Sequence, residues 1–278
     1  MATQKPLKVM YLNPVGSSAY DQVFADMARD HKLPQTEVHI TSLPASVGGF
    51  THIEFRSYEA MVTRGIIRAT RAAAREGFDA FAIGCFYDTA LHDAREVSGG
   101  MIVTAPCLAS CEIAASLSNR FGVIVGRRKW VHQMHSTVRE HGHEQRLSGF
   151  YHVELGVNDF QRDHAETERR LIEAGRKAVE EDYAEALILG CTLEVGFYKD
   201  VEKRLGVPVI DPSIAALKRA EYGAVLKQQC GWNPSRKWSS EPPSEEELAL
   251  FGGFDDGEIF GNRIVVPAEP AEPVRRAA

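Results

Sequence analysis

The sequence predicts an α/β protein made of two similar lobes, each a mostly parallel β-sheet flanked by helices. Short apolar runs alternate with helical patterns along most of the 278 residues, as in chains whose parallel strands are joined by crossover helices. Two segments, "AFAIGCFYDT" at 80–89 and "ALILGCTLEV" at 186–195, each contain an apolar run that ends in a Gly-Cys pair. In both segments an acidic residue follows three positions after the cysteine. A chain of this length can bury one large core or two modest ones, so the repeat favours two comparable lobes.

The first part of the chain alternates strands with helices. Strands are predicted where apolar residues run together, and helices where they recur with a 3.6-residue period. The helix over 58–76, for example, places Val62, Ile66 and Ala69 on one face. The predicted elements are strand 7–15, a helix to about Asp30, strand 36–44, the loop 46–52, helix 58–76, and strands 80–84 and 101–105.

The second part repeats the alternation. The last helix has a clear start, because Asp211 can cap it and Pro212 suits the first helical position. The predicted elements are helix 107–119, strand 121–126, helix 130–141, strand 151–155, helix 162–182, strand 186–190, helix 197–204, strand 207–211 and a helix from 212 to about 229.

These elements divide the chain into three parts. Residues 1–105 with 211–230 are expected to form the first lobe, and residues 106–210 the second. Residues 231–278 form a C-terminal extension that is partly irregular: "NPSRKWSSEPPSEEE" is polar and unlikely to pack alone, whereas "LFGGFDDGEIFGNRIVV" supplies aromatic residues and a possible strand. The extension is expected to clasp either the lobes or a neighbouring subunit.

The composition favours a cytoplasmic protein that acts on a small molecule. A net charge of −6 argues against a nucleic-acid partner, and no stretch approaches the roughly 20 apolar residues of a membrane span. No signal peptide is visible at the N-terminus. The row of arginines at 64, 68, 71 and 75 is therefore expected to be a solvated helix face. A homo-oligomer is expected because such folds commonly assemble.

The five cysteines do not resemble a disulfide framework, because their number is odd and their spacing is irregular. Cys107 and Cys111 are expected to pack on one helix, and Cys230 to be exposed. Cys85 and Cys191 differ from these, because each follows a strand and a glycine. Strand ends in open α/β sheets face a crevice, so both thiols are expected in the cleft between the lobes, where the active site would lie.

Two thiols facing one substrate carbon can act as a pair of bases. Turn N–H groups can lower the pKa of a thiol from about 8.5, which yields a thiolate near neutral pH. One sulfur would remove a proton from one face of the carbon and the other would deliver a proton to the opposite face. The alternative is that both cysteines only pack in the core, which is the common role of a single cysteine at a strand end. Asp88 and Glu194 are expected either to assist the thiols or only to favour the start of the following helices.

These segments resemble the Asp/Glu/hydantoin racemase superfamily, and within it the hydantoin and allantoin racemase branch. The resemblance covers about residues 7–226 and rests on "YLNP", "LPASVGGFTHIEFRSYEA", "IGCFYDTAL", "LILGCT" and "VPVIDPSIAALKRAEYGA". It implies a cofactor-independent racemase that acts on a hydantoin-like or allantoin-like ring, with Cys85 and Cys191 as the acid/base pair. The residues that it places around the substrate are Asn13, Ser17 and Ser18 in the first strand–helix loop, and Phe86 and Thr192 beside the thiols.

No cofactor or metal is expected. The chain lacks the phosphate-loop and dinucleotide-binding patterns, and His132 and His135 complete no zinc signature although their spacing would suit one. Other reactions on the same scaffold remain open: cis–trans isomerisation of a diacid such as maleate, racemisation of an amino acid, or decarboxylation of a malonate. The resemblance implies that decarboxylases of the superfamily need only the second of the two thiols, which is Cys191 in this chain. The presence of Cys85 therefore argues against decarboxylation. A binding protein with structural thiols is a further alternative.

Overall fold

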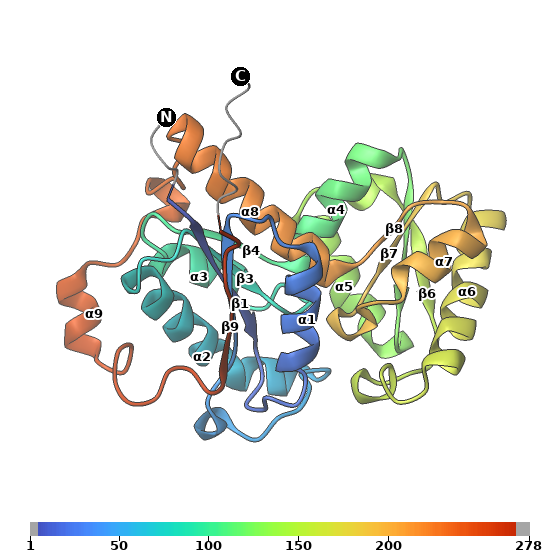
Figure 1. Cartoon of the computed structure of the whole chain (residues 1–278). Helices are drawn as coiled ribbons and strands as arrows, with labels where there is room; N and C mark the ends of the chain where they lie inside the picture. The colour runs from blue at the N-terminus through green and yellow to red at the C-terminus, as the bar shows by residue number, and fades with distance from the viewer. Residues whose placement is uncertain (1–4, 271–278) are drawn as a thin grey trace.

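Two β-sheets stand side by side in the computed structural model, which describes residues 5–270 (Figure 1). The first sheet has the strand order β4 (Ile102–Thr104), β3 (Ala80–Ile83), β1 (Leu7–Asn13), β2 (Thr36–Ser42) and β9 (Arg263–Val266). The second has the order β6 (Leu147–His152), β5 (Phe121–Val125), β7 (Ala186–Leu189) and β8 (Val209–Ile210). All neighbouring strands pair in parallel except β2 and β9. The predicted fold class is confirmed.

Helices cover both faces of the first sheet. Successive residues of a strand point to opposite faces, so Tyr11 of β1 packs in one core and Leu12 in the other. Helices α1 (Asp21–His31) and α8 (Pro212–Cys230) cover the first of these faces, and α2 (Arg56–Arg75) and α3 (Leu91–Val97) the second. The core beneath α1 and α8 continues into the second lobe, which joins the lobes through buried apolar contact.

The second sheet is flanked by α4 (Pro106–Leu117), α5 (Val131–Glu140), α6 (His164–Glu180) and α7 (Tyr198–Leu205). Short 3₁₀ turns complete the lobes: η1 (Ala45–Val47), η2 (Arg128–Trp130), η3 (Glu144–Arg146), η4 (Val157–Asp159), η5 (Thr192–Glu194) and, in the extension, η6 (Trp238–Ser240). The strand predicted over 151–155 instead begins at Leu147 and ends at His152. It is the outer strand of its sheet and is only partly buried, so it lacks the apolar run that marks a central strand.

The chain returns to the first lobe through Asp211, which caps α8 as predicted. Its carboxylate accepts hydrogen bonds from the backbone N–H groups of Ser213 at 2.9 Å and Ile214 at 3.3 Å. The second carboxylate oxygen accepts from Gly196 N–H at 3.0 Å and so also holds the loop that follows η5. The sheets draw their strands from 7–104 with 263–266 and from 121–210; the lobe boundaries at 105 and 210 stay a prediction.

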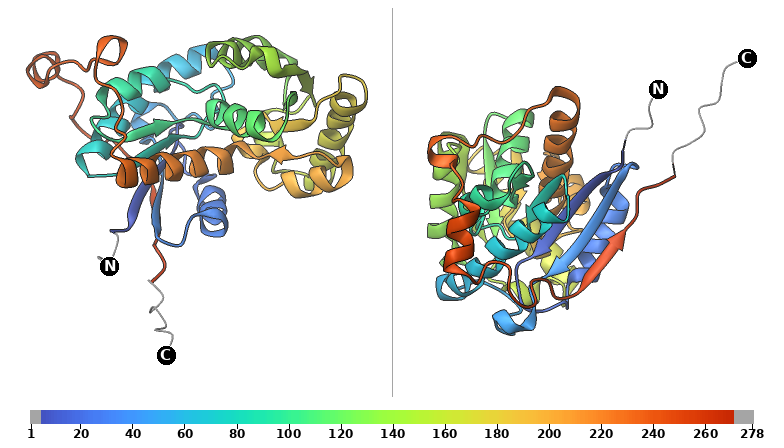
Figure 2. Two further views of the ribbon diagram at one scale, coloured as in Figure 1. Left: turned by 90° about the horizontal axis from the view of Figure 1, so that it is seen from above. Right: turned by 90° about the vertical axis from the view of Figure 1, so that its left-hand side faces the viewer.

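The C-terminal extension packs against the first lobe. The extension continues from the end of α8, and its short helix α9 (Glu245–Phe251) lies on the outer side of α2. It then returns to the edge of the first sheet as β9 (Figures 1 and 2). The predicted strand is therefore present, and it pairs antiparallel with β2 between Thr41↔Arg263 and Val38↔Val266. No helix among residues 5–270 combines the length and apolar character that a membrane crossing needs.

The arginine row on α2 holds this extension, so its interpretation as a solvated face is wrong for the buried Arg71, whereas Arg64 and Arg75 are exposed as predicted. The side chain of Arg71 is only 6% exposed. The contacts are Arg64 Nη2 to the Gly253 carbonyl at 3.1 Å, Arg68 Nε to the Phe254 carbonyl at 3.2 Å, and Arg71 to Glu245 at 2.8 Å and Asp255 at 3.0 Å. The acidic residues of the extension thus meet the basic face of α2. Sequence periodicity placed the arginines on one face but did not show what covers them.

Candidate active site

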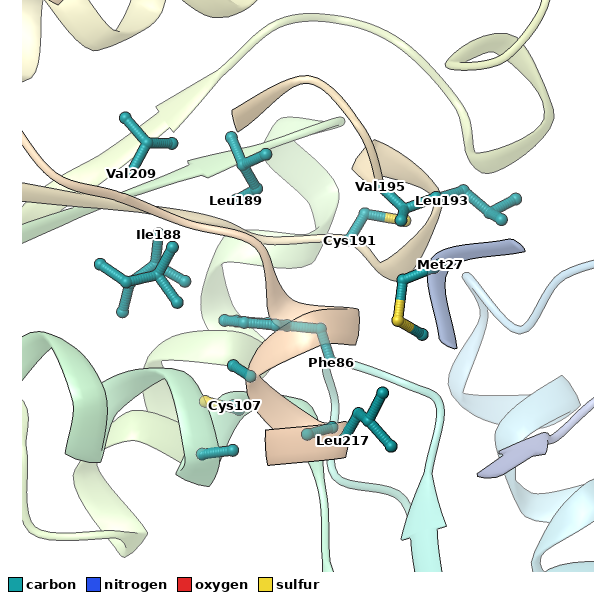
Figure 3. Close-up of a cluster of buried hydrophobic side chains, with 14 of the residues drawn as sticks. Met27, Phe86, Cys107, Ile188, Leu189, Cys191, Leu193, Val195, Val209 and Leu217 are labelled. Atoms are coloured by element: carbon teal, nitrogen blue, oxygen red, sulfur yellow. The ribbon is translucent and has the colours of Figure 1, made fainter. Parts of the chain in front are cut away.

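A pocket that is open at its mouth lies where the carboxyl ends of the strands from both sheets meet. Cys85, which follows β3, and Cys191, which follows β7, both line it. The structure therefore brings together the two predicted thiols, one from each lobe, although they are far apart in the sequence. Cys191 lies with Leu193 and Val195 at the edge of the buried cluster in Figure 3.

The glycine before each cysteine explains why the Gly-Cys pair occurs twice. Gly84 N–H donates to the Leu12 carbonyl at 2.7 Å, and Gly190 N–H donates to the Ile124 carbonyl at 2.6 Å. A methyl group on Gly84 or Gly190 would lie 2.7 or 2.6 Å from the same carbonyl oxygen, closer than packing permits. Only glycine lets each strand end press against its neighbour while the next residue turns its thiol toward the pocket.

Thr192 joins the two Gly-Cys units directly. Its hydroxyl donates to the Gly84 carbonyl at 3.2 Å, across the junction between the lobes. The Thr192 carbonyl in turn accepts from the hydroxyl of Ser213 at 3.0 Å, and the buried Tyr11 hydroxyl donates to Ser213 at 3.2 Å. Thr192 lines the pocket as predicted, but in this arrangement its hydroxyl is occupied in holding the lobes together.

Burial controls the protonation of both thiols. It raises the pKa of Cys85 to about 12 and the pKa of Cys191 well above its ordinary value. The predicted turn N–H groups are present, from Tyr87 to Cys85 and from Leu193 to Cys191, and they lower the two pKa values by less than burial raises them. The turn N–H groups therefore lower the two pKa values as expected, but burial outweighs them and favours the protonated form of both thiols.

We expect alkylation to follow this protonation. At pH 7 iodoacetamide should label the exposed Cys230 well before Cys85 or Cys191, because only the thiolate reacts. Labelling of Cys85 should then accelerate about tenfold per pH unit between pH 7 and 10, since the thiolate fraction grows by that factor below a pKa of about 12. Peptide mass spectrometry measures each site. A Cys85 rate that levels off below pH 8 would show that its pKa is not raised.

The two acidic residues that follow the cysteines have different structural roles, and neither belongs to the pocket lining. Asp88 accepts from the N–H groups of Cys107 and Leu108, both at 2.8 Å, and from His141 Nε2 at 2.8 Å. It thereby caps α4 rather than the helix that follows it. Glu194 is fully buried and accepts from Cys191 N–H at 3.1 Å, so it braces the backbone that carries the second thiol. Burial raises the pKa of Glu194.

The remaining predicted site residues divide into two groups. Asn13 and Phe86 line the pocket, and Phe86 also packs in the buried cluster that Cys191 borders (Figure 3). Ser17 and Ser18 are absent from the lining among the described residues, and Ser18 is exposed. Ser17 instead offers its backbone carbonyl to the Asn13 side-chain amide at 3.4 Å. The first strand–helix loop therefore reaches the pocket through Asn13 but not through these two side chains.

Sequence reasoning missed most of the pocket walls. The segment 51–54 from the first lobe crosses to the second, where the carboxylate of Glu54 accepts from Arg127 Nη1 and from Val157 N–H, both at 3.0 Å. Glu54 lies in the segment "LPASVGGFTHIEFRSYEA", which contributes to the family resemblance, but the sequence alone assigns it no role in the site. Further lining residues are Pro14, Val15, Tyr20, Phe24, Tyr87, Trp130, Met134 and Leu193. Apolar residues give no sequence signal that separates a pocket wall from a core.

The histidines at 132 and 135 do not converge on a metal. His132 is exposed, and His135 pairs with Glu144 at 3.1 Å. Within residues 5–270, the one group of three side chains with ligand atoms close enough for an ion is Asp88, Cys107 and His141. Asp88 there already accepts the three hydrogen bonds that cap α4 and hold His141. Cys107 and Cys111 are buried on α4 as predicted.

Comparison with known proteins identifies relatives over most of the chain. The family model described as Asp/Glu/Hydantoin racemase matches residues 9–220. The hydantoin racemase of Pseudomonas sp. (strain NS671) is 32% identical over 249 residues, which covers 88% of this chain and 97% of that protein. The hydantoin racemase of Paenarthrobacter aurescens is 31% identical over 242 residues, 87% of this chain and 99% of that one. Among solved structures, the allantoin racemase from Klebsiella pneumoniae aligns with a TM-score of 0.80 at 25% identity, covering 90% of this chain and 98% of that one.

Proposed function

This chain belongs to the Asp/Glu/hydantoin racemase family, and on that premise we propose that it racemises a hydantoin-type ring with Cys85 and Cys191 as its acid/base pair. The observation that carries the proposal is that both thiols line one pocket, from the carboxyl ends of strands in opposite sheets. The proposed reaction needs no cofactor, because the two sulfurs supply both proton transfers.

The stereocentre of a 5-substituted hydantoin lies beside a ring carbonyl. Because burial favours both thiols in protonated form, one of them first releases its proton to solvent. The resulting thiolate removes the proton from the stereocentre, and the electron pair passes to the carbonyl oxygen as an enolate. The thiol on the other side then delivers its proton to the opposite face, which leaves it as the thiolate and regenerates the carbonyl. The reverse reaction exchanges the two roles. Turn N–H groups of Tyr87 and Leu193 would stabilise the sulfur that carries the charge.

The pocket lining favours a neutral ring over a diacid or a free amino acid. Within the described chain, no lysine or arginine lines the pocket, whereas Glu54 does. A maleate, malonate or aspartate would bring carboxylates into largely apolar surroundings without a lysine or arginine to pair with them, which is costly. The aromatic and aliphatic walls instead suit an apolar ring substituent. The names of the relatives, hydantoin racemase and allantoin racemase, point to the same class of ring.

The proposal extends to the setting of the protein. All five cysteines are free thiols, which suits a reducing compartment such as the cytoplasm. The partner would be a small molecule, and assembly into a homo-oligomer stays a prediction.

Deuterium exchange tests the proposed function. Single enantiomers of 5-benzylhydantoin are incubated with the protein in D₂O, and optical rotation and mass are followed together. We expect loss of rotation, with one deuterium incorporated at the stereocentre per inversion, above the rate in buffer. The same assay with allantoin, maleate, aspartate and a phenylmalonate ranks the alternatives. Binding of the hydantoin without exchange would make the protein a binder and exclude the racemase.

A further inference from the structure

A buried polar chain connects the pocket to the C-terminal extension. Asp21, the first residue of α1, has no exposed surface. Its Oδ1 accepts from Asn13 Nδ2 at 3.0 Å and its Oδ2 accepts from Asn262 Nδ2 at 3.2 Å. Asn13 lines the pocket, and Asn262 lies in the extension, directly before β9. The buried carboxylate of Asp21 therefore accepts one hydrogen bond from an amide at the pocket and one from an amide in the C-terminal extension.

Asp21 determines which way the Asn13 amide points. A carboxylate only accepts hydrogen bonds, so the NH₂ end of Asn13 must face it. The same NH₂ group donates to the Ser17 carbonyl at 3.4 Å, so both of its protons are directed away from the pocket. The side-chain oxygen of Asn13 remains as the group that a ligand can use. It is a hydrogen-bond acceptor, and a hydantoin ring presents N–H donors.

The extension holds Asn262 firmly in this place. Its backbone carbonyl accepts from the Thr41 hydroxyl at 2.8 Å and from Ser42 N–H at 3.3 Å. The preceding Gly261 donates its N–H to the Ser42 carbonyl at 2.8 Å, and a methyl group there would lie 2.7 Å from the Leu43 carbonyl oxygen. The close approach that glycine permits brings the Asn262 side chain to Asp21.

We propose that Asn262 and Asp21 are positioning residues that orient the Asn13 amide so that its oxygen accepts a ring N–H of the substrate. The extension then contributes to substrate recognition and does not only cover the first lobe. Without Asn262, the buried carboxylate of Asp21 loses one of its two amide donors. The carboxylate oxygen that had accepted from Asn262 would then accept hydrogen bonds from other donors. As a result, the Asn13 amide would no longer be held in one orientation. The inference rests on the proposed function.

Kinetics of Asn262→Ala with 5-benzylhydantoin test the proposal. We expect KM to rise about five- to tenfold, the effect of one impaired hydrogen bond, with kcat changed less than about twofold. Asn262→Asp should raise KM further, because it sets a second carboxylate against Asp21. The matched control is Arg263→Ala in the adjacent position, which breaks an ion pair with Glu76 at 2.7 Å but leaves Asp21 untouched. Its KM should equal that of the wild type.

Two further measurements separate positioning from mere stability. In the Asn13→Ala background, Asn262→Ala should have no added effect on KM. Hydantoins methylated at N1 or N3 lack one ring N–H, and one of the two should show no KM difference between Asn262→Ala and wild type. Equal KM increases in Asn262→Ala and Arg263→Ala, or a full Asn262→Ala effect without Asn13, would overturn the proposal. A wild-type protein that racemises no hydantoin would instead refute the proposed function, and this inference with it.

Discussion

Replacing either Cys85 or Cys191 with serine should reduce racemisation of 5-benzylhydantoin by about 10³-fold or more, because each removes one of the two proton-transferring groups. A serine hydroxyl fits the space of a thiol but ionises far less readily. Both cysteines line the same pocket from opposite sheets, so neither can replace the other. Polarimetry measures the loss, and circular dichroism checks that the variants fold.

The two serine variants should also differ in a complementary way. Each keeps the thiol on one side, so each should exchange the proton of one enantiomer in D₂O without inverting it, and the two variants should select opposite enantiomers. Cys230→Ser is the control, because that thiol is exposed and outside the pocket lining. Racemisation at the wild-type rate in either pocket variant would show that the two-thiol mechanism is wrong.

Alanine at Gly84 or Gly190 should reduce both stability and catalysis. The added methyl group would meet the Leu12 or Ile124 carbonyl oxygen at 2.7 or 2.6 Å, so the strand end has to move. We expect the free energy of unfolding to fall by about 1–3 kcal/mol, as in overpacked cores. Since the adjacent thiol moves with the backbone, kcat should fall about 10²-fold, the effect of displacing a reacting group by about 1 Å.

Denaturant titration and steady-state kinetics measure the two effects of these glycine variants. Gly49→Ala is the matched control, because a methyl group there meets no atom within 4 Å. It should leave stability and kcat close to the wild type. A Gly190→Ala protein with wild-type kcat would show that close packing of the strand end does not position Cys191.

The local sequence was enough to predict the fold class and to identify the two candidate thiols. Apolar runs and helical periods depend on neighbours within a few residues, and central strands such as β1 and β7 are buried on both faces, so their patterns are strong. The Gly-Cys pairs were informative for the same reason, because each glycine answers a steric demand of its own strand end. The partly buried outer strand β6 has no such pattern, and its bounds were misplaced.

The sequence by itself determined the alternation of strands and helices, the cap at Asp211 and the pair of cysteines that follow a strand and a glycine. Only the tertiary structure determined which residues the side chains contact. Asp88 caps a helix that begins well beyond it in the chain, Arg71 binds the extension, and Asn262 reaches Asp21. It also decided that burial raises the pKa of both thiols. The physical reason is that burial and pairing depend on residues distant in the chain, and no local pattern records which of them will lie close in space.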